Sequence, residues 1–256
     1  MDRSTLNLGE SIARAVKQMV ADADTVTPYR EPLVRFVDAH HPRFRELRAL
    51  ADPEHMMPQD LLPGAQSVVS FFIPFHHRVV EANARDRRAV AEEWAMVYVE
   101  TNALIGRVTD HLIGLLASRG IRAAAEPATG NFDLDSLTSR WSHKSVAVVA
   151  GLGSFGRHQM IITDAGCAGR LGSLVTEAHL PAPSVELRER CLNFYDGSCR
   201  VCVERCPMEA LSERQGIDRQ RCWNRCLEVS KLYEHLGTAQ VCGKCAIGPC
   251  SFEAPV

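Results

Sequence analysis

The residues best suited to chemistry in this chain are its cysteines, and their spacing points to metal binding. Nine of the ten cysteines fall in the last third of the chain, which contains CLNFYDGSCRVCVERCPMEAL, then DRQRCWNRC, then VCGKCAIGPC, and Cys167 is the only one outside it. Cys199, Cys202 and Cys206 form C-x2-C-x3-C-P, and the C-x2-C step recurs in VCGKC. Thiolates spaced in this way wrap one metal centre from one loop, so the sequence predicts metal here.

Iron–sulfur clusters account for this pattern better than zinc or disulfides do. The C-x2-C-x3-C-P run matches the closing part of a bacterial ferredoxin motif, whereas a zinc knuckle has no use for the proline or the third cysteine. Disulfide scaffolds are cysteine-dense throughout, but the first 166 residues contain no cysteine. Two 4Fe-4S clusters are therefore the first predicted cofactors, and a structural zinc site with four thiolate ligands is the alternative.

Two such clusters need four cysteine ligands each. Asp196 stands where a standard ferredoxin motif has its first cysteine, so Cys191 is predicted to supply that ligand through a longer loop. Cys226, four residues after Cys222, is the alternative ligand, and Cys167 is expected to be a structural or pocket cysteine. Because the last cysteine of each motif crosses to the other cluster in two-cluster ferredoxins, we expect one set of Cys191, Cys199, Cys202 and Cys250, and another of Cys206, Cys222, Cys242 and Cys245.

A glycine motif lies in the middle of the chain, within WSHKSVAVVAGLGSFGRHQMIITDAGCAGRLGS. Gly151, Gly153 and Gly156 satisfy G-x-G-x-x-G, which is a dinucleotide fingerprint where a strand precedes it and a helix follows. SVAVVA suits the preceding strand. Only about eight residues separate Gly156 from the turn at Asp164, however, and MIIT among them favours a strand over a helix. The spacing therefore argues against nucleotide binding.

The remaining pattern predicts a mixed α/β layer that positions these motifs. Amphipathic spacing predicts a first helix over residues 6–22 and the longest helix over 85–118, and residues 33–39 are interpreted as a short helix followed by irregular structure. SVVSFFIPF, ending at Pro74, and IRAAAEP are predicted strands. We expect an α/β domain over residues 1–183 and a ferredoxin-like domain over 184–256.

Charge and apolar content predict which partners and which cellular compartment to expect. Lys plus Arg total 29 against 31 Asp plus Glu, and the net charge of -2 predicts against a nucleic-acid partner. No stretch approaches the roughly 20 apolar residues of a membrane span, so no membrane partner is expected. The first residues contain no apolar export segment, and reduced, metal-bound thiols are typical of the cytoplasm, which is the predicted location.

The middle and the tail together resemble the epoxyqueuosine reductase-like iron–sulfur proteins. The resemblance rests on LLPGAQSVVSFFIPF, WSHKSVAVVAGLGSFG, MIITDAGCAGRLGS and the cysteine-rich tail. These proteins are relatives of the tRNA epoxyqueuosine reductases and, more distantly, of the reductive dehalogenases. The resemblance implies a nitroreductase-like α/β domain that holds a corrinoid, and a ferredoxin-like domain with two 4Fe-4S clusters that delivers electrons to it.

The resemblance also implies roles for individual residues. It places a cofactor pocket at the glycine motif, where glycines let the backbone approach a flat macrocycle, with a hairpin around residues 170–173 beside it. The alternative is that the glycines only shape a tight turn. Tyr98 and His143 are the candidate catalytic residues, as proton donors in this pocket. The expected cofactor contacts are Gly151, Gly153, Phe155, Gly156, Arg170 and Ser173.

One departure concerns the catalytic acid. The queuosine enzymes carry an acidic proton donor ahead of the glycine motif, where this chain reads NFDLDSLTSRWSHK. Asp133 and Asp135 correspond only approximately, and the position given by direct count is Leu137. This argues against epoxyqueuosine itself as the substrate.

The predicted function is that of an iron–sulfur oxidoreductase, a corrinoid-dependent reductase that passes electrons from two clusters to a bound cofactor or substrate. Its expected partners are an electron donor such as ferredoxin or flavodoxin, and a small molecule or modified nucleoside as substrate. One alternative is an electron-transfer protein that has lost the corrinoid. The other is a flavin-binding reductase, because nitroreductase-like folds often bind flavin.

Overall fold

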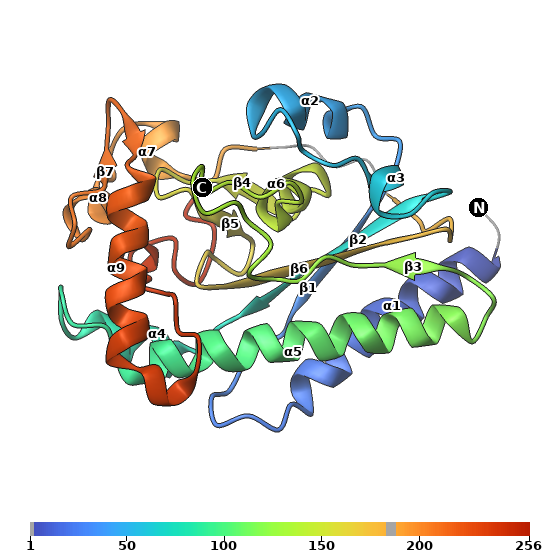
Figure 1. The fold of residues 1–256 in the computed structure, drawn as a ribbon, viewed down its shortest axis with the longest axis horizontal. Helices are drawn as coiled ribbons and strands as arrows, with labels where there is room; N and C mark the ends of the chain where they lie inside the picture. Colours follow the sequence, from blue (N-terminus) through green and yellow to red (C-terminus); the bar gives the residue numbers. More distant parts are fainter. Residues whose placement is uncertain (1–2, 183–187) are drawn as a thin grey trace.

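The structure is a computed structural model, and it describes residues 3–182 and 188–256 (Figure 1). Its centre is a four-stranded antiparallel sheet with the strand order β1-β2-β6-β3. The two central strands pair over eight residues, from Ser67 opposite Thr176 to Pro74 opposite Gly169. The strands are β1 (Leu33–Asp38), β2 (Ser67–Pro74), β3 (Ala123–Ala124) and β6 (Gly169–Thr176).

Helices cover both faces of this sheet, so the fold is a mixed α/β sandwich as predicted (Figure 1). On one face, α1 (Arg3–Ala21) and α5 (Glu92–Ala117) pack on alternate residues of β2, such as Val69 and Phe71. On the other face, α2 (Arg43–Leu50) and α6 (His143–Val149) pack on the intervening residue Val68. Successive strand residues point to opposite faces, which explains why SVVSFFIP is buried at every position.

Short elements connect these layers to the cysteine-rich tail. The helices α3 (Pro58–Leu61) and α4 (His77–Ala84) flank β2, and β4 (Gly153–Phe155) pairs with β5 (Ile161–Thr163) as a separate hairpin. The tail contains α7 (Leu192–Tyr195), α8 (Val201–Glu204), β7 (Leu211–Ser212), β8 (Gly216–Ile217), α9 (Arg219–Leu232) and the 3-10 turns Glu234–Leu236 and Lys244–Ala246.

The tail packs directly on the α/β part through a shared apolar cluster. Phe75 and Trp94 of the α/β part contact residues such as Val229 and Ala246 of the tail. Lys244 of the tail adds hydrogen bonds to the α/β part. Its buried Nζ donates to Asn83 O at 2.6 Å, Asn83 Oδ1 at 2.8 Å and Asp86 O at 3.0 Å. The predicted domain boundary at 183/184 lies outside the described residues, so the division into two domains stays a prediction.

Five predicted features differ from the structure. Residues 33–38 form the strand β1, because LVRFVD pairs along its whole length with β2. SVAVVA belongs to the helix α6, and residues 170–173 lie inside the straight strand β6 rather than in a hairpin. The helix predicted over 85–118 begins only at Glu92, and the stretch expected to be irregular contains α2 and α3. None of the helices in the described ranges combines the length and the apolar character needed to cross a bilayer.

Candidate metal centre and cofactor site

Four thiols of the first predicted set line one cavity at the start of the tail. It lies among residues from three separate stretches of the chain. Cys191 precedes α7, Cys202 lies in α8, and Cys250 comes from the last residues. The thiols that line the cavity are Cys191, Cys199, Cys202 and Cys250, with Cys245 from the other set.

The electrostatics of this cavity suit a cationic centre. Burial first, and then the neighbouring Cys250, Cys191 and Cys199, raise the pKa of Cys202 to about 12. Thiols packed together away from water resist ionisation, and a metal cation removes this penalty by binding the thiolate directly. All ten cysteines are free thiols and none is paired in a disulfide. The donor set therefore fits an iron–sulfur cluster.

A second group of thiols surrounds Cys245. Its pKa lies well above the usual value because of burial first, and then because of the neighbouring Cys222, Cys242, Cys202 and Cys206. The Sγ atom of Cys206 accepts a hydrogen bond from the backbone N–H of Ala210 at 3.2 Å. The second predicted set thus also gathers around one point, and Cys245 lies between the two sets. The assignment of individual ligands stays a prediction.

Cys226 lies beside Cys222 on α9, one helical turn away. A hydrogen bond with Cys226 is the main cause that lowers the pKa of Cys222 to about 7, with a further contribution from the Lys144 ammonium. The same contact raises the pKa of Cys226. Cys226 therefore neighbours the second set as a partner of a predicted ligand, and the cavity of the first set does not include it.

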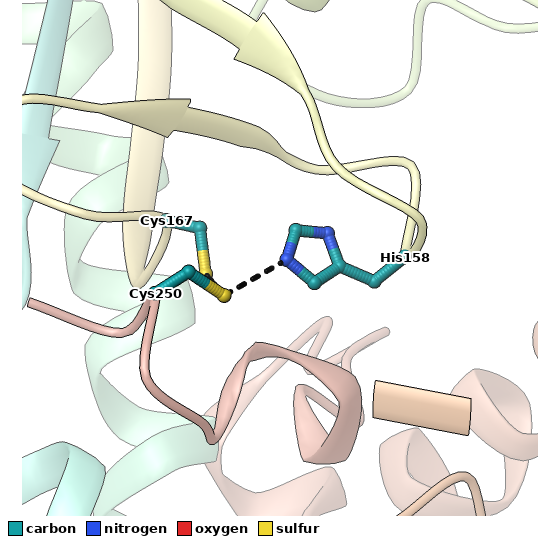
Figure 2. Close-up of side chains that lie close together, drawn as sticks. All are labelled: His158, Cys167 and Cys250. Atoms are coloured by element: carbon teal, nitrogen blue, oxygen red, sulfur yellow. Dashed lines mark hydrogen bonds between the residues drawn. The ribbon is translucent and has the colours of Figure 1, made fainter. Parts of the chain in front are cut away.

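Cys250 connects the tail to the α/β part. Its carbonyl accepts from Cys167 N at 2.8 Å, and its Sγ lies 3.8 Å from Cys167 Sγ and 3.4 Å from His158 Nε2 (Figure 2). Contact with Cys167 first, and then with His158, lowers the pKa of Cys250 to about 5. Cys167 is thus a buried neighbour of a predicted ligand, and its Sγ lies within 4.8 Å of the ligand atoms of His158 and Cys250.

Local backbone structure explains the glycines at positions 151 and 153 of the motif. Gly151 has a φ of +74°, and the bonds from Gly151 N to Val148 O and from Leu152 N to Ala147 O form a Schellman cap at the end of α6. A Cβ on Gly153 would lie 2.1 Å from Ile162 O, because the hairpin strands pair there. A helix precedes the motif and a strand lies within it, so the arrangement does not match a dinucleotide site, as expected.

Phe155 ends the hairpin strand β4, and Gly156 directly follows it. Phe155 is half-buried and packs with Ala147, Leu152 and Ile161, while a Cβ on Gly156 would lie 2.7 Å from His158 Cε1. Each glycine of the motif thus has a local contact that would account for it under the alternative interpretation, in which the glycines only shape a turn. Their role in holding a cofactor stays a prediction.

The other predicted cofactor and catalytic residues lie around β6, where β3 pairs only with Val175 and Thr176. Arg170 places its guanidinium 4.3 Å from the ring centroid of Tyr98 and donates to Ala128 O at 3.3 Å. Tyr98 OH lies 3.3 Å from Thr129 Oγ1. The segment 127–129 continues from β3 along β6, and it covers both side chains.

His143 and Ser173 meet on the opposite face of β6, since residues 170 and 173 of a strand point to opposite sides. Ser173 Oγ accepts from Trp141 Nε1 at 3.0 Å, so its own proton is available to His143 Nδ1 at 2.8 Å. His143 Nε2 then carries the ring proton and donates to Pro127 O at 3.0 Å. Both ring nitrogens are occupied, so proton donation to a substrate would require the Pro127 contact to break.

Acidification should destabilise the protein through His143. Burial lowers the pKa of His143 from 6.5 to about 4, so above pH 6.5 the folded protein gains the full benefit of the neutral ring. As pH falls from 6.5 toward 4, the unfolded chain binds the proton and the folded chain does not, so stability is lost. Between about pH 7.5 and pH 5.5 we expect His143 to remove about 1.3 kcal/mol from the free energy of unfolding.

Urea unfolding at both pH values would measure this loss, with the variant His143→Gln expected to flatten the pH dependence. His179→Gln is the control, because His179 is exposed. An equal pH dependence in the wild type and in His143→Gln would contradict the assignment.

The approximate candidates for a catalytic acid lie in a surface turn. The Asp133 carboxylate accepts from Ser136 N, Ser136 Oγ and Asp135 N at 2.7 to 3.1 Å, and these hydrogen bonds lower its pKa, with the Ser136 backbone first. Such a carboxylate stays ionised and is a poor proton donor near neutrality. Leu137, the position given by direct count, has a φ of +54° within the same turn.

Sequence reasoning missed two residues of the site. His158 lies in the cysteine cavity, although no spacing in the sequence links it to Cys250, 92 residues away. Lys244 is buried between two predicted ligands, and its position inside the VCGKC step was the one available signal.

Comparison with known proteins agrees with the resemblance stated from the motifs. An epoxyqueuosine reductase from Bacillus cereus is 24% identical over 172 residues, which cover 64% of this chain and 41% of the relative. The one from Gloeobacter violaceus is 26% identical over 184 residues, covering 69% of this chain and 51% of the relative. The chain resembles the epoxyqueuosine reductases. No protein-family model matches it.

Solved structures of epoxyqueuosine reductases share the fold. One, in complex with an epoxyqueuosine-modified stem loop of tRNA-Tyr, aligns with a TM-score of 0.61 and 20% identity over 95% of this chain and 65% of that one. Another, from Streptococcus thermophilus, has a TM-score of 0.56 and 14% identity, covering 98% of this chain and 68% of the other. The predicted mixed α/β fold class is confirmed, and the ferredoxin-like character of the tail stays a prediction. The chain spans about half the length of the curated relatives that it matches.

The tRNA-bound structure counts against one expectation. The sequence argued against a nucleic-acid partner from the net charge of -2 alone, yet a protein of the same fold binds a tRNA stem loop. Net charge does not describe how charge is distributed over a surface, so a balanced total does not exclude a local site for phosphates.

Proposed function

We propose that this chain is an iron–sulfur oxidoreductase that carries two 4Fe-4S clusters in its tail and delivers their electrons to a site at the edge of β6. The observation that carries the proposal is the cavity lined by Cys191, Cys199, Cys202 and Cys250, which brings together thiols from distant parts of the chain. Iron–sulfur clusters are one-electron carriers, so a protein electron donor such as ferredoxin or flavodoxin would refill them.

The second set of thiols is the one that neighbours the predicted site. The ammonium of Lys144 on α6 acts on Cys222, and Lys144 directly follows His143. Phe132, in the loop after the segment 127–129, packs edge-on against Trp223 of α9 with ring centroids 5.2 Å apart. These contacts support a route in which electrons leave the second set toward α6 and β6.

The corrinoid that the resemblance implies is part of the proposal, with binding residues at the edge of β6. Arg170 Nε is buried and has no hydrogen-bond partner among the described residues, so a polar cofactor group there would satisfy it. Tyr98, His143 and the rest of the Arg170 guanidinium already contact the segment 127–129, so this segment must move for a macrocycle to bind. When bound, a corrinoid would supply cobalt-centred reduction chemistry.

The substrate is proposed to be a reducible organic molecule, for which a modified nucleoside in tRNA is the candidate offered by the solved relative. Asp133 is held ionised in its turn, which argues for a substrate other than epoxyqueuosine or for another proton donor. The cytoplasm is the proposed location, since free thiols of this kind persist there.

Anaerobic reconstitution of the full chain with iron and sulfide, followed by assays of iron, sulfide, cobalt and flavin, tests the proposal. We expect about eight iron atoms per chain, with a cluster absorption band that dithionite bleaches. Cobalamin is then added, and its retention and spectrum are followed with and without a tRNA stem loop. Retained cobalamin supports the reductase, two clusters without cobalamin would support the electron-transfer alternative, and bound flavin would support the flavin alternative.

A further inference from the structure

His158 is a buried side chain that lies among the thiols of the first predicted set but has no assigned role. It is 3% exposed, and it lines the same cavity as Cys191, Cys199, Cys202 and Cys250. Its Nε2 atom lies 3.4 Å from the Sγ of Cys250 (Figure 2). This is the one hydrogen bond between a histidine ring and a cysteine sulfur in residues 3–182 and 188–256.

The direction of this hydrogen bond follows from the other ring nitrogen. Nδ1 accepts from the backbone N–H of Met160 at 3.0 Å, so Nδ1 carries no proton. In a neutral imidazole the proton must then reside on Nε2, which makes Nε2 the donor and the Cys250 sulfur the acceptor.

Both partners are held in place by backbone contacts. The turn that carries His158 is closed by the bond from Gly156 N to Met160 O at 2.9 Å, and Gly156 leaves room for the imidazole because a Cβ there would lie 2.7 Å from it. Cys250 is fixed by the bond from Cys167 N to its carbonyl, and Ser251 O accepts from Ala168 N at 3.2 Å. The donor is thus presented by the α/β part and the acceptor by the tail.

A hydrogen bond to a cluster thiolate favours the reduced state, in which the cluster is more negative, and so raises its reduction potential. We propose that His158 is a positioning residue that donates an N–H···S hydrogen bond to Cys250 and makes the first cluster easier to reduce than it is without this bond. The inference rests on the proposed function, since it requires Cys250 to ligate a cluster.

The test uses the full chain reconstituted anaerobically, with redox titration of each cluster by electron paramagnetic resonance and iron counted in the same samples. His158→Leu removes the donor, whereas His158→Gln keeps an N–H at similar reach. His235→Leu is the matched control, because His235 is an exposed histidine of the tail whose ring bonds only to Glu92.

We expect all variants to keep about eight iron atoms. In His158→Leu the ratio of reduced to oxidised first cluster at a fixed potential should fall about tenfold, which is about 59 mV for a one-electron couple, while the other cluster is unchanged. His158→Gln should recover most of this shift, and His235→Leu should show none.

Three results would overturn the inference. Unchanged potentials in His158→Leu with full iron would reject the role of His158 and leave the two clusters standing. Loss of about half of the iron in His158→Leu but not in His158→Gln would mean that His158 is needed to hold a cluster rather than to adjust it. A wild-type chain that binds a single zinc, lost in both His158 variants, would identify His158, Cys167 and Cys250 as a mononuclear site and would reject the cluster proposal as well.

Discussion

Replacing Cys191 by alanine is expected to lower the iron content of the anaerobically reconstituted chain from about eight to about four atoms. Cys191 lines the cavity of the first set with Cys199, Cys202 and Cys250, so its loss leaves that cluster with three cysteine ligands. The second set contains none of these residues and should keep its iron. Iron and acid-labile sulfide assays on the purified variant, with the cluster absorption band, measure the effect.

Cys226→Ala is the matched control for this experiment. Cys226 is also a partly buried cysteine of the tail, but it lies outside the cavity and contacts Cys222 instead. We expect it to leave the iron content unchanged. Full iron in Cys191→Ala together with a deficit in Cys226→Ala would show that the eighth ligand is Cys226 and that the loop assignment of Cys191 is wrong.

The second large effect is expected at Gly243, in the loop between Cys242 and Cys245. Gly243 has a φ of +69°, and a Cβ added there would lie 2.1 Å from the indole of Trp94. Trp94 is buried and packs edge-on against Phe75 at 5.3 Å, so it has no room to retreat. Left-handed backbone strain and overpacking together should make Gly243→Ala lose about 3 kcal/mol of stability, or roughly 6 to 12 °C in Tm.

Gly216→Ala separates the two causes. Gly216 has a similar φ of +75° in the β7–β8 hairpin of the tail, but nothing lies within 4 Å of an added Cβ. This variant should therefore lose only the strain, about 1 to 2 kcal/mol. Thermal unfolding followed by circular dichroism, with both variants loaded with clusters in parallel, provides the comparison. Equal losses in the two variants would mean that Trp94 does not restrict the loop.

Sequence reasoning succeeded where a signal was local and strong. The strand at SVVSFFIP is buried throughout, and the apolar stripes of α1 and α5 extend over enough residues to distinguish a helix from a strand. The cysteines that the motif spacing groups together lie near one another in the structure, and their assignment to two clusters stays a prediction. These features depend on neighbours that are close in the sequence.

The failures arose where distant residues decide the local structure. LVRFVD becomes a strand because β2 offers it a pairing edge, which its own six residues do not reveal. SVAVVA is apolar and β-branched, yet Ser142 caps it by accepting from Ser145 N, so it becomes the buried helix α6. That cap was a signal that the sequence contained. His158 offered none, because its partner Cys250 is remote in the chain.

The bond between Cys167 N and Cys250 O has a consequence for the order of assembly. The two residues are 83 positions apart, so closing this contact carries the entropy cost of a long loop, and we expect it to follow the formation of local contacts. Until then the first set lacks one of its four thiols in place. We therefore expect the proposed first cluster to be completed late in folding, after the tail has docked on the α/β part.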